Sequence, residues 1–176
     1  MIDQLKLPEV WLRGPVPGLP VLLQPIAFAL MQAREDVNEM TRNFSDNLLY
    51  ERPGGAASAA FHLQHLTGVL DRMFTYAEGK ALTEKQLEWL NMEGKNQNQN
   101  YAVQDLVNFF NNQIATSIQK LREINLETLT EPRGVGRKQL PSTVFGLLVH
   151  SAEHTQRHVG QLLVTVKVLQ APIFRR

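Results

Sequence analysis

The hydrophobic positions of this chain recur with the period of an α-helix. In the first helical segment, apolar residues follow alternating spacings of four and three from Ile26 to Phe44, and charged or amide side chains fill the intervening positions. Comparable stripes occur in three later segments, and no strand-like alternation rivals them. The pattern predicts an all-α protein built as a four-helix bundle. The predicted helices cover about 22–44, 56–78, 102–124 and 143–169.

Prolines near the N-terminus predict an irregular segment before the first helix. Residues 1–20 contain three closely spaced prolines from Pro15 to Pro20, which predicts an extended N-terminal arm rather than a helix. Trp11 and Leu12 are expected to pack this arm onto the body of the protein.

Local signals also mark the connections between helices. Gly79 is a suitable residue to end the second long helix. Thr83 and Gln86 have the spacing of a capping box, which predicts a short extra helix running to about Met92. Ser142 is the expected N-cap of the last helix.

Length and composition indicate one globular domain over residues 1–176. The hydrophobic fraction is 43% and the charged fraction 20%, which is ordinary for a protein with a single buried core. The net charge of +1 gives no concentrated basic surface, so nucleic acid and membranes are not expected partners. The uncharged stretch from 14 to 33 is interrupted by prolines and is not expected to span a bilayer.

The chain contains no cysteine. This excludes disulfide bonds and thiolate ligands from the protein itself, and it fits a reducing compartment. The N-terminus shows no basic segment followed by an apolar run, so no signal peptide is expected and a cytoplasmic location is predicted.

Histidine placement is the strongest chemical signal. His150, His154 and His158 recur every fourth residue within a predicted helix and therefore project from neighbouring positions of one side. This side also carries Leu147, Leu162 and Leu169, so the three histidines are expected to lie on an inward stripe that faces the core. Imidazoles one turn apart can bind the same divalent cation, and a third ligand from a facing helix would complete a three-histidine site. His65 is the natural third ligand, with His62 as an alternative. The spacing alone does not select which two of the three C-terminal histidines bind.

The same histidines are also compatible with a packing role, in which they bond to the backbone or to one another. Three protein ligands would leave a coordination position for water or substrate, as in catalytic metal sites. Asp71 and Glu153 are candidate carboxylates for orienting the histidines, and surface roles for both are equally compatible. The chain has no nucleophile elbow, phosphate-binding loop or dinucleotide fingerprint.

Two motifs resemble those of the DinB/YfiT-like family of metal-binding proteins. The segment from His154 to Gln161 contains the characteristic H-x-x-x-H-x-G-Q in full, and the stretch FHLQHLTG, ending at Gly68, resembles the histidine motif of the second helix. The pair Asp71–Arg72 and the stretch WLRGP near the N-terminus are also typical of a DinB-like subgroup. The resemblance extends over nearly the whole chain.

This resemblance implies a bundle of the up-down-down-up type, a metal triad at His65, His154 and His158, and frequent dimerisation. His62 and His150 have no ligand role by the match. Zinc or nickel is the implied metal, with iron or manganese as alternatives, because imidazole ligands discriminate weakly among these ions.

The implied functions are several. Members of the family include S-transferases that use a low-molecular-weight thiol, so the leading hypothesis is a thiol-dependent transferase that attacks a small-molecule substrate through a metal-bound thiolate. The alternatives are a metal-dependent hydrolase and a non-catalytic metal- or ligand-binding protein of a stress response. No catalytic base is predicted.

Overall fold

The computed structural model describes residues 7–95 and 101–172. Five α-helices and one β-hairpin make up its regular structure, joined by short 3-10 turns. The helices are α1 (Gln24–Thr41), α2 (Ala59–Ala77), α3 (Glu84–Met92), α4 (Val103–Glu123) and α5 (Val144–Gln170). The hairpin strands are β1 (Pro132–Val135) and β2 (Leu140–Thr143), which pair antiparallel.

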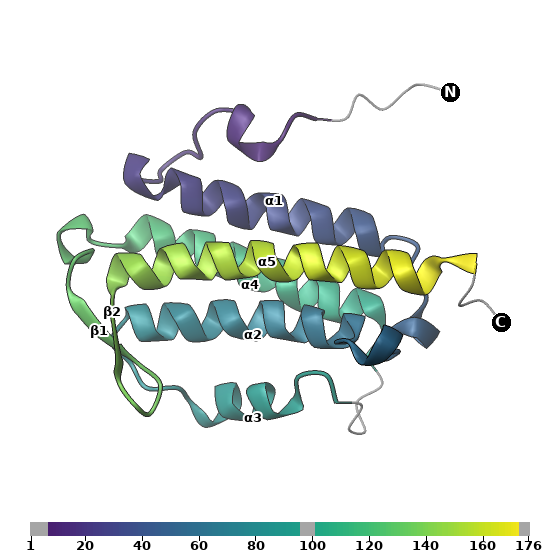
Figure 1. Ribbon diagram of the computed structural model, residues 1–176. Helices are drawn as coiled ribbons and strands as arrows, with labels where there is room; N and C mark the ends of the chain where they lie inside the picture. Colours follow the sequence, from purple (N-terminus) through teal and green to yellow (C-terminus); the bar gives the residue numbers. More distant parts are fainter. Residues whose placement is uncertain (1–6, 96–100, 173–176) are drawn as a thin grey trace.

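The four long helices form the predicted bundle of the up-down-down-up type. Helices α1 and α5 run in one direction and α2 and α4 in the other (Figure 1). Around the bundle the helices follow the order α1, α5, α2, α4, so α2 and α5 are direct neighbours. Because α2 and α4 run parallel, the chain must return along the whole bundle between them. Helix α3, the predicted short helix, lies in this connection and packs on the outside of α2 (Figure 1).

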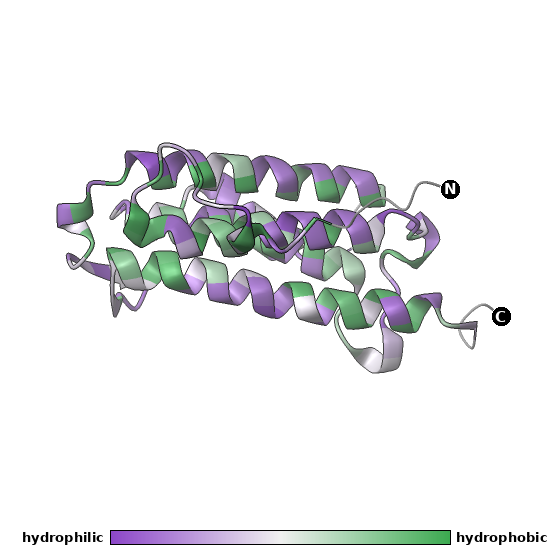
Figure 2. Ribbon diagram, turned by 90° about the horizontal axis from the view of Figure 1, so that it is seen from above, coloured by the Kyte–Doolittle hydropathy of each residue, from purple (hydrophilic) through white to green (hydrophobic). Residues whose placement is uncertain are grey.

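The bundle encloses one continuous hydrophobic core. Green and purple segments alternate along the helices in Figure 2, as expected for helices with one face turned inward. The predicted stripe from Ile26 to Phe44 is buried except for the half-buried Met40. Among the described residues, no helix combines the length and hydrophobicity needed to cross a membrane. The largest fully buried side chains include Leu30, Leu63, Leu70, Phe74, Phe110, Ile114, Leu121 and Leu148.

Several local signals act as predicted. Gly79 follows α2 with φ +71°, a left-handed conformation that glycine adopts without strain. Thr83 and Gln86 form a reciprocal capping box at the start of α3. The predicted N-cap at Ser142 was wrong by one residue. The hydroxyl of Thr143 accepts the hydrogen bond from the Gly146 N–H at 3.0 Å, because strand β2 continues through Thr143 before the helix begins.

The N-terminal arm approaches α1 at Val10, in a different way from the prediction. Val10 is buried, and its backbone N–H donates to the Gln32 side chain at 2.9 Å. Trp11 and Leu12 were expected to pack on the body, but they are 58% and 56% exposed. The 3-10 turn Val10–Leu12 allows only one of its three side chains to face α1, and Val10 takes that position.

Candidate metal centre

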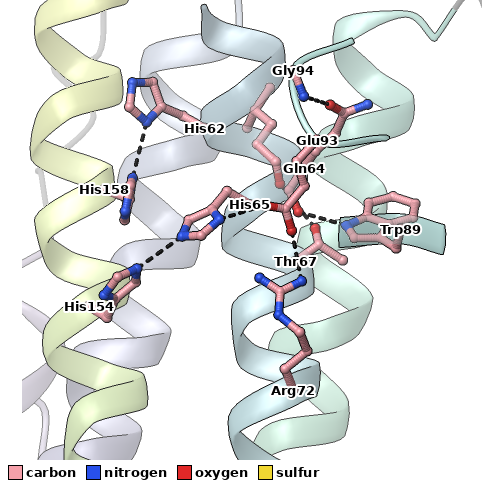
Figure 3. Close-up of polar contacts among 11 residues, drawn as sticks. His62, Gln64, His65, Thr67, Arg72, Trp89, Glu93, Gly94, His154 and His158 are labelled. Carbon is pink, nitrogen blue, oxygen red and sulfur yellow. Dashed lines mark hydrogen bonds and ion pairs between the residues drawn. The ribbon is translucent and has the colours of Figure 1, made fainter. Parts of the chain in front are cut away.

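Three histidines meet where α2 and α5 lie side by side. His65 comes from the middle of α2, and His154 and His158 lie one turn apart on α5 (Figure 3). All three are half-buried, so they lie at the edge of the core and not within it. The predicted inward stripe of the last helix was therefore wrong for its histidines. Each step of four residues turns about 40° beyond a full circle, so a series of such steps leaves the core face.

The three imidazole rings are close enough to share one ion. Their candidate ligand nitrogens all lie within 4.8 Å of one another, and the Nε2 atoms of His65 and His154 are 2.9 Å apart. Two nitrogen ligands of a tetrahedral zinc ion lie about 3.3 Å apart. The spacing between these two side chains therefore needs only a small adjustment to accept a cation.

A buried atom in this cluster also lacks a hydrogen bond. His154 Nδ1 is excluded from solvent and has no hydrogen-bond partner among the described residues. Burying an unpaired polar group costs free energy, and such groups in folded proteins call for an explanation. A metal bond made by Nδ1 itself would offset this cost, whereas a bond made by Nε2, the nitrogen that faces His65, would not. Three neutral imidazoles also form a donor set that zinc and nickel accept.

His65 is oriented by a carboxylate on its other side. Its Nδ1 lies 2.6 Å from Glu93 Oε2, and the second carboxylate oxygen accepts from Arg72 Nη1 at 2.7 Å (Figure 3). The Glu93 side chain is only 4% exposed. A neutral His65 donates its Nδ1 hydrogen to this carboxylate, which leaves the Nε2 lone pair directed at α5. This is the arrangement that fixes histidine ligands in metal sites.

Helix α3 carries Glu93 to this position and is firmly attached to α2. Trp89 Nε1 donates to the Gln64 carbonyl oxygen at 2.8 Å, and the Gly94 N–H donates to the Gln64 side chain at 2.7 Å. Gly68 leaves the necessary space. A Cβ there would lie 2.6 Å from Arg72 Nη1, 2.6 Å from Glu93 Oε1 and 2.7 Å from Trp89 Cδ1. The absence of a side chain at this position therefore lets the carboxylate and guanidinium meet behind His65.

Glu93 was not predicted from the sequence, and the two carboxylates that were considered lie elsewhere. Asp71 accepts a hydrogen bond from Gln86 Nε2 at 2.8 Å. Glu153 is an exposed residue that pairs with Arg157 and His150. No spacing rule connects Glu93 with a histidine 28 positions earlier. Only the return of α3 across α2 brings them together.

His62 supports the α5 side of the cluster. Its Nδ1 lies 3.2 Å from His158 Nδ1, and the residue is 4% exposed (Figure 3). One of these two nitrogens carries the hydrogen and the other accepts it. His158 therefore uses Nδ1 in this contact and keeps Nε2 for the space between the helices.

His62, His154 and His158 are neutral near pH 7. Burial lowers the pKa of each to about 4, and the nearby imidazole of His65 adds to the effect. Neutral imidazole is the form that binds metal ions. His150 differs from the others, because its side chain is 47% exposed and lies outside the cluster of His65, His154 and His158.

Comparisons with known proteins agree with this architecture. The sequence model of the DinB superfamily matches residues 29–162, which include all five histidines. The crystal structure of a conserved protein from Enterococcus faecalis is similar, with a TM-score of 0.63 and 16% identity over 84% of this chain and 96% of that chain. At this identity the likeness is one of fold. No curated protein sequence matches the chain.

Proposed function

The chain belongs to the DinB superfamily, and we propose that His65, His154 and His158 bind one divalent cation at which a small-molecule substrate reacts. The convergence of the three side chains from two helices carries this proposal. Zinc or nickel is the proposed metal, with iron or manganese as alternatives that the same ligands accept. Glu93 and His62 hold two of the three imidazoles in the orientation that a metal requires.

The proposed reaction is transfer to or from an external thiol. A divalent ion at this site would lower the pKa of a thiol or of water and so supply a nucleophile at neutral pH. Three protein ligands leave a position for such a molecule, and the half-buried histidines lie at the edge of the core. Because the chain has no cysteine, the thiol must come from a separate low-molecular-weight compound.

Within this proposal the protein contributes orientation and charge. His65 would stay neutral as a ligand, with its Nδ1 hydrogen held by Glu93. Arg72 pairs with Glu93 at 2.7 Å and so supplies a counter-charge to this buried carboxylate. The Phe61 ring stacks on His65 with ring centroids 5.3 Å apart and limits rotation of that imidazole.

A homodimer in the cytoplasm is proposed as the working state. Exposed aliphatic side chains on α5 support self-association, since apolar groups on a surface favour contact with another protein. These residues are Val149, Leu163 and Val164. Sedimentation at several protein concentrations measures the association directly.

An activity assay with four arms tests the proposed chemistry. Protein purified without nickel affinity is incubated with electrophilic substrates, with and without a low-molecular-weight thiol, and before and after treatment with a chelator. The proposal predicts product that requires both thiol and metal. Product formed with metal but without thiol identifies a hydrolase instead. Metal bound without turnover of any substrate indicates a non-catalytic binding protein.

A further inference from the structure

All five histidines of the chain form one continuous series of neighbouring rings. From the surface inward, the ring centroids are 5.1 Å apart for His150 and His154 and 4.7 Å for His154 and His158. His158 then lies 4.4 Å from His65 and 5.5 Å from His62. The series begins at the exposed His150 and ends at the buried His62. The proposed metal triad uses only the middle of it, so His150 has no role in that site.

His150 belongs to a second group of potential ligands on the outer face of α5. The ligand atoms of His150, Glu153 and His154 all lie within 4.8 Å of one another. His150 Nδ1 is 3.4 Å from Glu153 Oε2, and both side chains are nearly half exposed, at 47% and 49%. Positions i, i+3 and i+4 share one helix face, and imidazole and carboxylate are both ligands for zinc and related cations.

From these contacts we propose that His150, Glu153 and His154 form an outer metal-binding site that captures the cation from solvent and passes it to the inner triad. His154 is the ligand that both groups share. An ion held by His150, Glu153 and His154 can exchange its first two ligands for His65 and His158 without leaving His154. The transfer changes only coordination bonds, and no electron or proton has to be supplied.

Sharing one ligand makes the two sites exclusive. While the inner triad holds an ion, His154 is directed toward His65, and the outer group keeps only an imidazole and one carboxylate. Two exposed ligands bind a cation weakly, so the intact protein holds one ion and not two. The inner site has three imidazole ligands, and Glu93 orients one of them. The inner site therefore binds the ion more tightly than the outer site, and the ion moves from the outer site to the inner one.

Arg157 controls the availability of the outer carboxylate. Its guanidinium pairs with Glu153 Oε1, on the same face of α5. The arginine therefore competes with a cation for Glu153 and places a positive charge near the capture site. Removing this charge should speed capture, whereas removing His150 should slow it. Variants at these two exposed positions therefore have opposite expected effects.

The outer site is tested first without the inner one, so this test does not depend on the proposed function. In the double variant His65→Ala/His158→Ala, only the outer group retains its three ligands. Titration with Co²⁺, followed by absorbance, is expected to show weakened but measurable binding. Adding His150→Ala should abolish that binding. Equal binding with and without His150 would overturn the proposed site. Circular dichroism confirms that the variants compared are folded.

The transfer step rests on the proposed function and is tested by the rate of metal uptake. Stopped-flow quenching of tryptophan fluorescence by Co²⁺ gives the association rate of metal-free protein. Arg157→Ala is expected to accelerate association by about tenfold, the scale on which local charge changes on-rates, because it removes a positive charge beside Glu153. His150→Ala is expected to slow association to a similar extent, because the outer site loses one of its three ligands. Both variants should still bind one ion per chain at equilibrium.

The possible outcomes separate the two proposals. If the unmodified protein binds no ion, the proposed function fails. If it binds one ion and His150→Ala associates at the unmodified rate, the triad stands and the transfer route is wrong. A rate that falls for His150→Ala but is unchanged for a distant exposed variant, Lys85→Ala, supports the route.

Discussion

Replacing Gly68 by alanine tests whether α3 holds the metal site in shape. The added methyl group would lie 2.6–2.7 Å from atoms of Arg72, Glu93 and Trp89, closer than real contacts allow. At least one of these side chains must move. Arg72 and Glu93 form a buried pair, and Glu93 contacts His65 directly, so a displacement of Glu93 reaches the candidate ligand.

The expected magnitude combines two opposing effects. Overpacking of a buried contact costs about 1–3 kcal/mol of folding free energy. Alanine in place of glycine inside a helix stabilises the folded state by about 1 kcal/mol, because its helix propensity is higher. The net destabilisation of Gly68→Ala is therefore about 0–2 kcal/mol. Loss of the Glu93 contact should also weaken metal binding by about 10–100-fold, because ligands depend to that extent on the groups that orient them.

Gly160→Ala supplies the matched control. Gly160 also lies inside a long helix, but a Cβ there would meet no atom within 4 Å. This variant keeps the gain in helix propensity and lacks the steric cost, so it should be more stable by up to about 1 kcal/mol. Both variants gain helix propensity, so the difference between their free energies of unfolding measures the steric cost at Gly68.

The assays are urea unfolding of the metal-free variants and titration with Zn²⁺. We expect Gly68→Ala to be less stable than Gly160→Ala by about 1–3 kcal/mol, and we expect only Gly68→Ala to lose metal affinity. Equal stabilities and equal affinities in the two variants would refute the role given to α3.

Glu93→Gln keeps the shape but removes the charge, so it should weaken Zn²⁺ binding by about 10–100-fold in calorimetry and leave Arg72 buried without its counter-ion. Metal-free protein should lose stability as the pH falls from about 6.5 to about 4, because unfolded histidines bind protons while the buried His62 does not; a flat stability profile from urea melts over this range would contradict it. Val164→Glu should weaken self-association in sedimentation, since Val164 is 61% exposed on the proposed dimer face, and an unchanged dimer would exclude that face.

The helices could be predicted from the sequence because each depends on a pattern within a single segment. The apolar positions from Ile26 to Met40 define one face of α1, and the capping box at Thr83 and Gln86 places the start of α3. These signals involve residues within a few turns of one another, so a sequence contains them directly. The direction of the helices came from the family resemblance, and the order of elements in Figure 1 agrees with it.

The surroundings of the site were harder to predict because they depend on contacts between distant segments. The spacing of His154 and His158 is local, and the sequence presented it plainly. The Glu93 contact with His65 depends on where α3 crosses α2, which no local pattern encodes. His150 was assigned to the inward stripe, although it is exposed, because steps of four residues drift around a helix.

Calorimetric titration of metal-free protein with Zn²⁺ tests whether His65, His154 and His158 bind one metal ion. We expect one tightly bound ion per chain for the unmodified protein and for His150→Ala. His65→Ala and His158→Ala should retain only the weak binding of the outer group, and His154→Ala, which lacks the ligand shared by both groups, should bind no ion. If the unmodified protein bound no ion, or if His150→Ala lost as much affinity as the three triad variants, the assignment of the triad would be wrong.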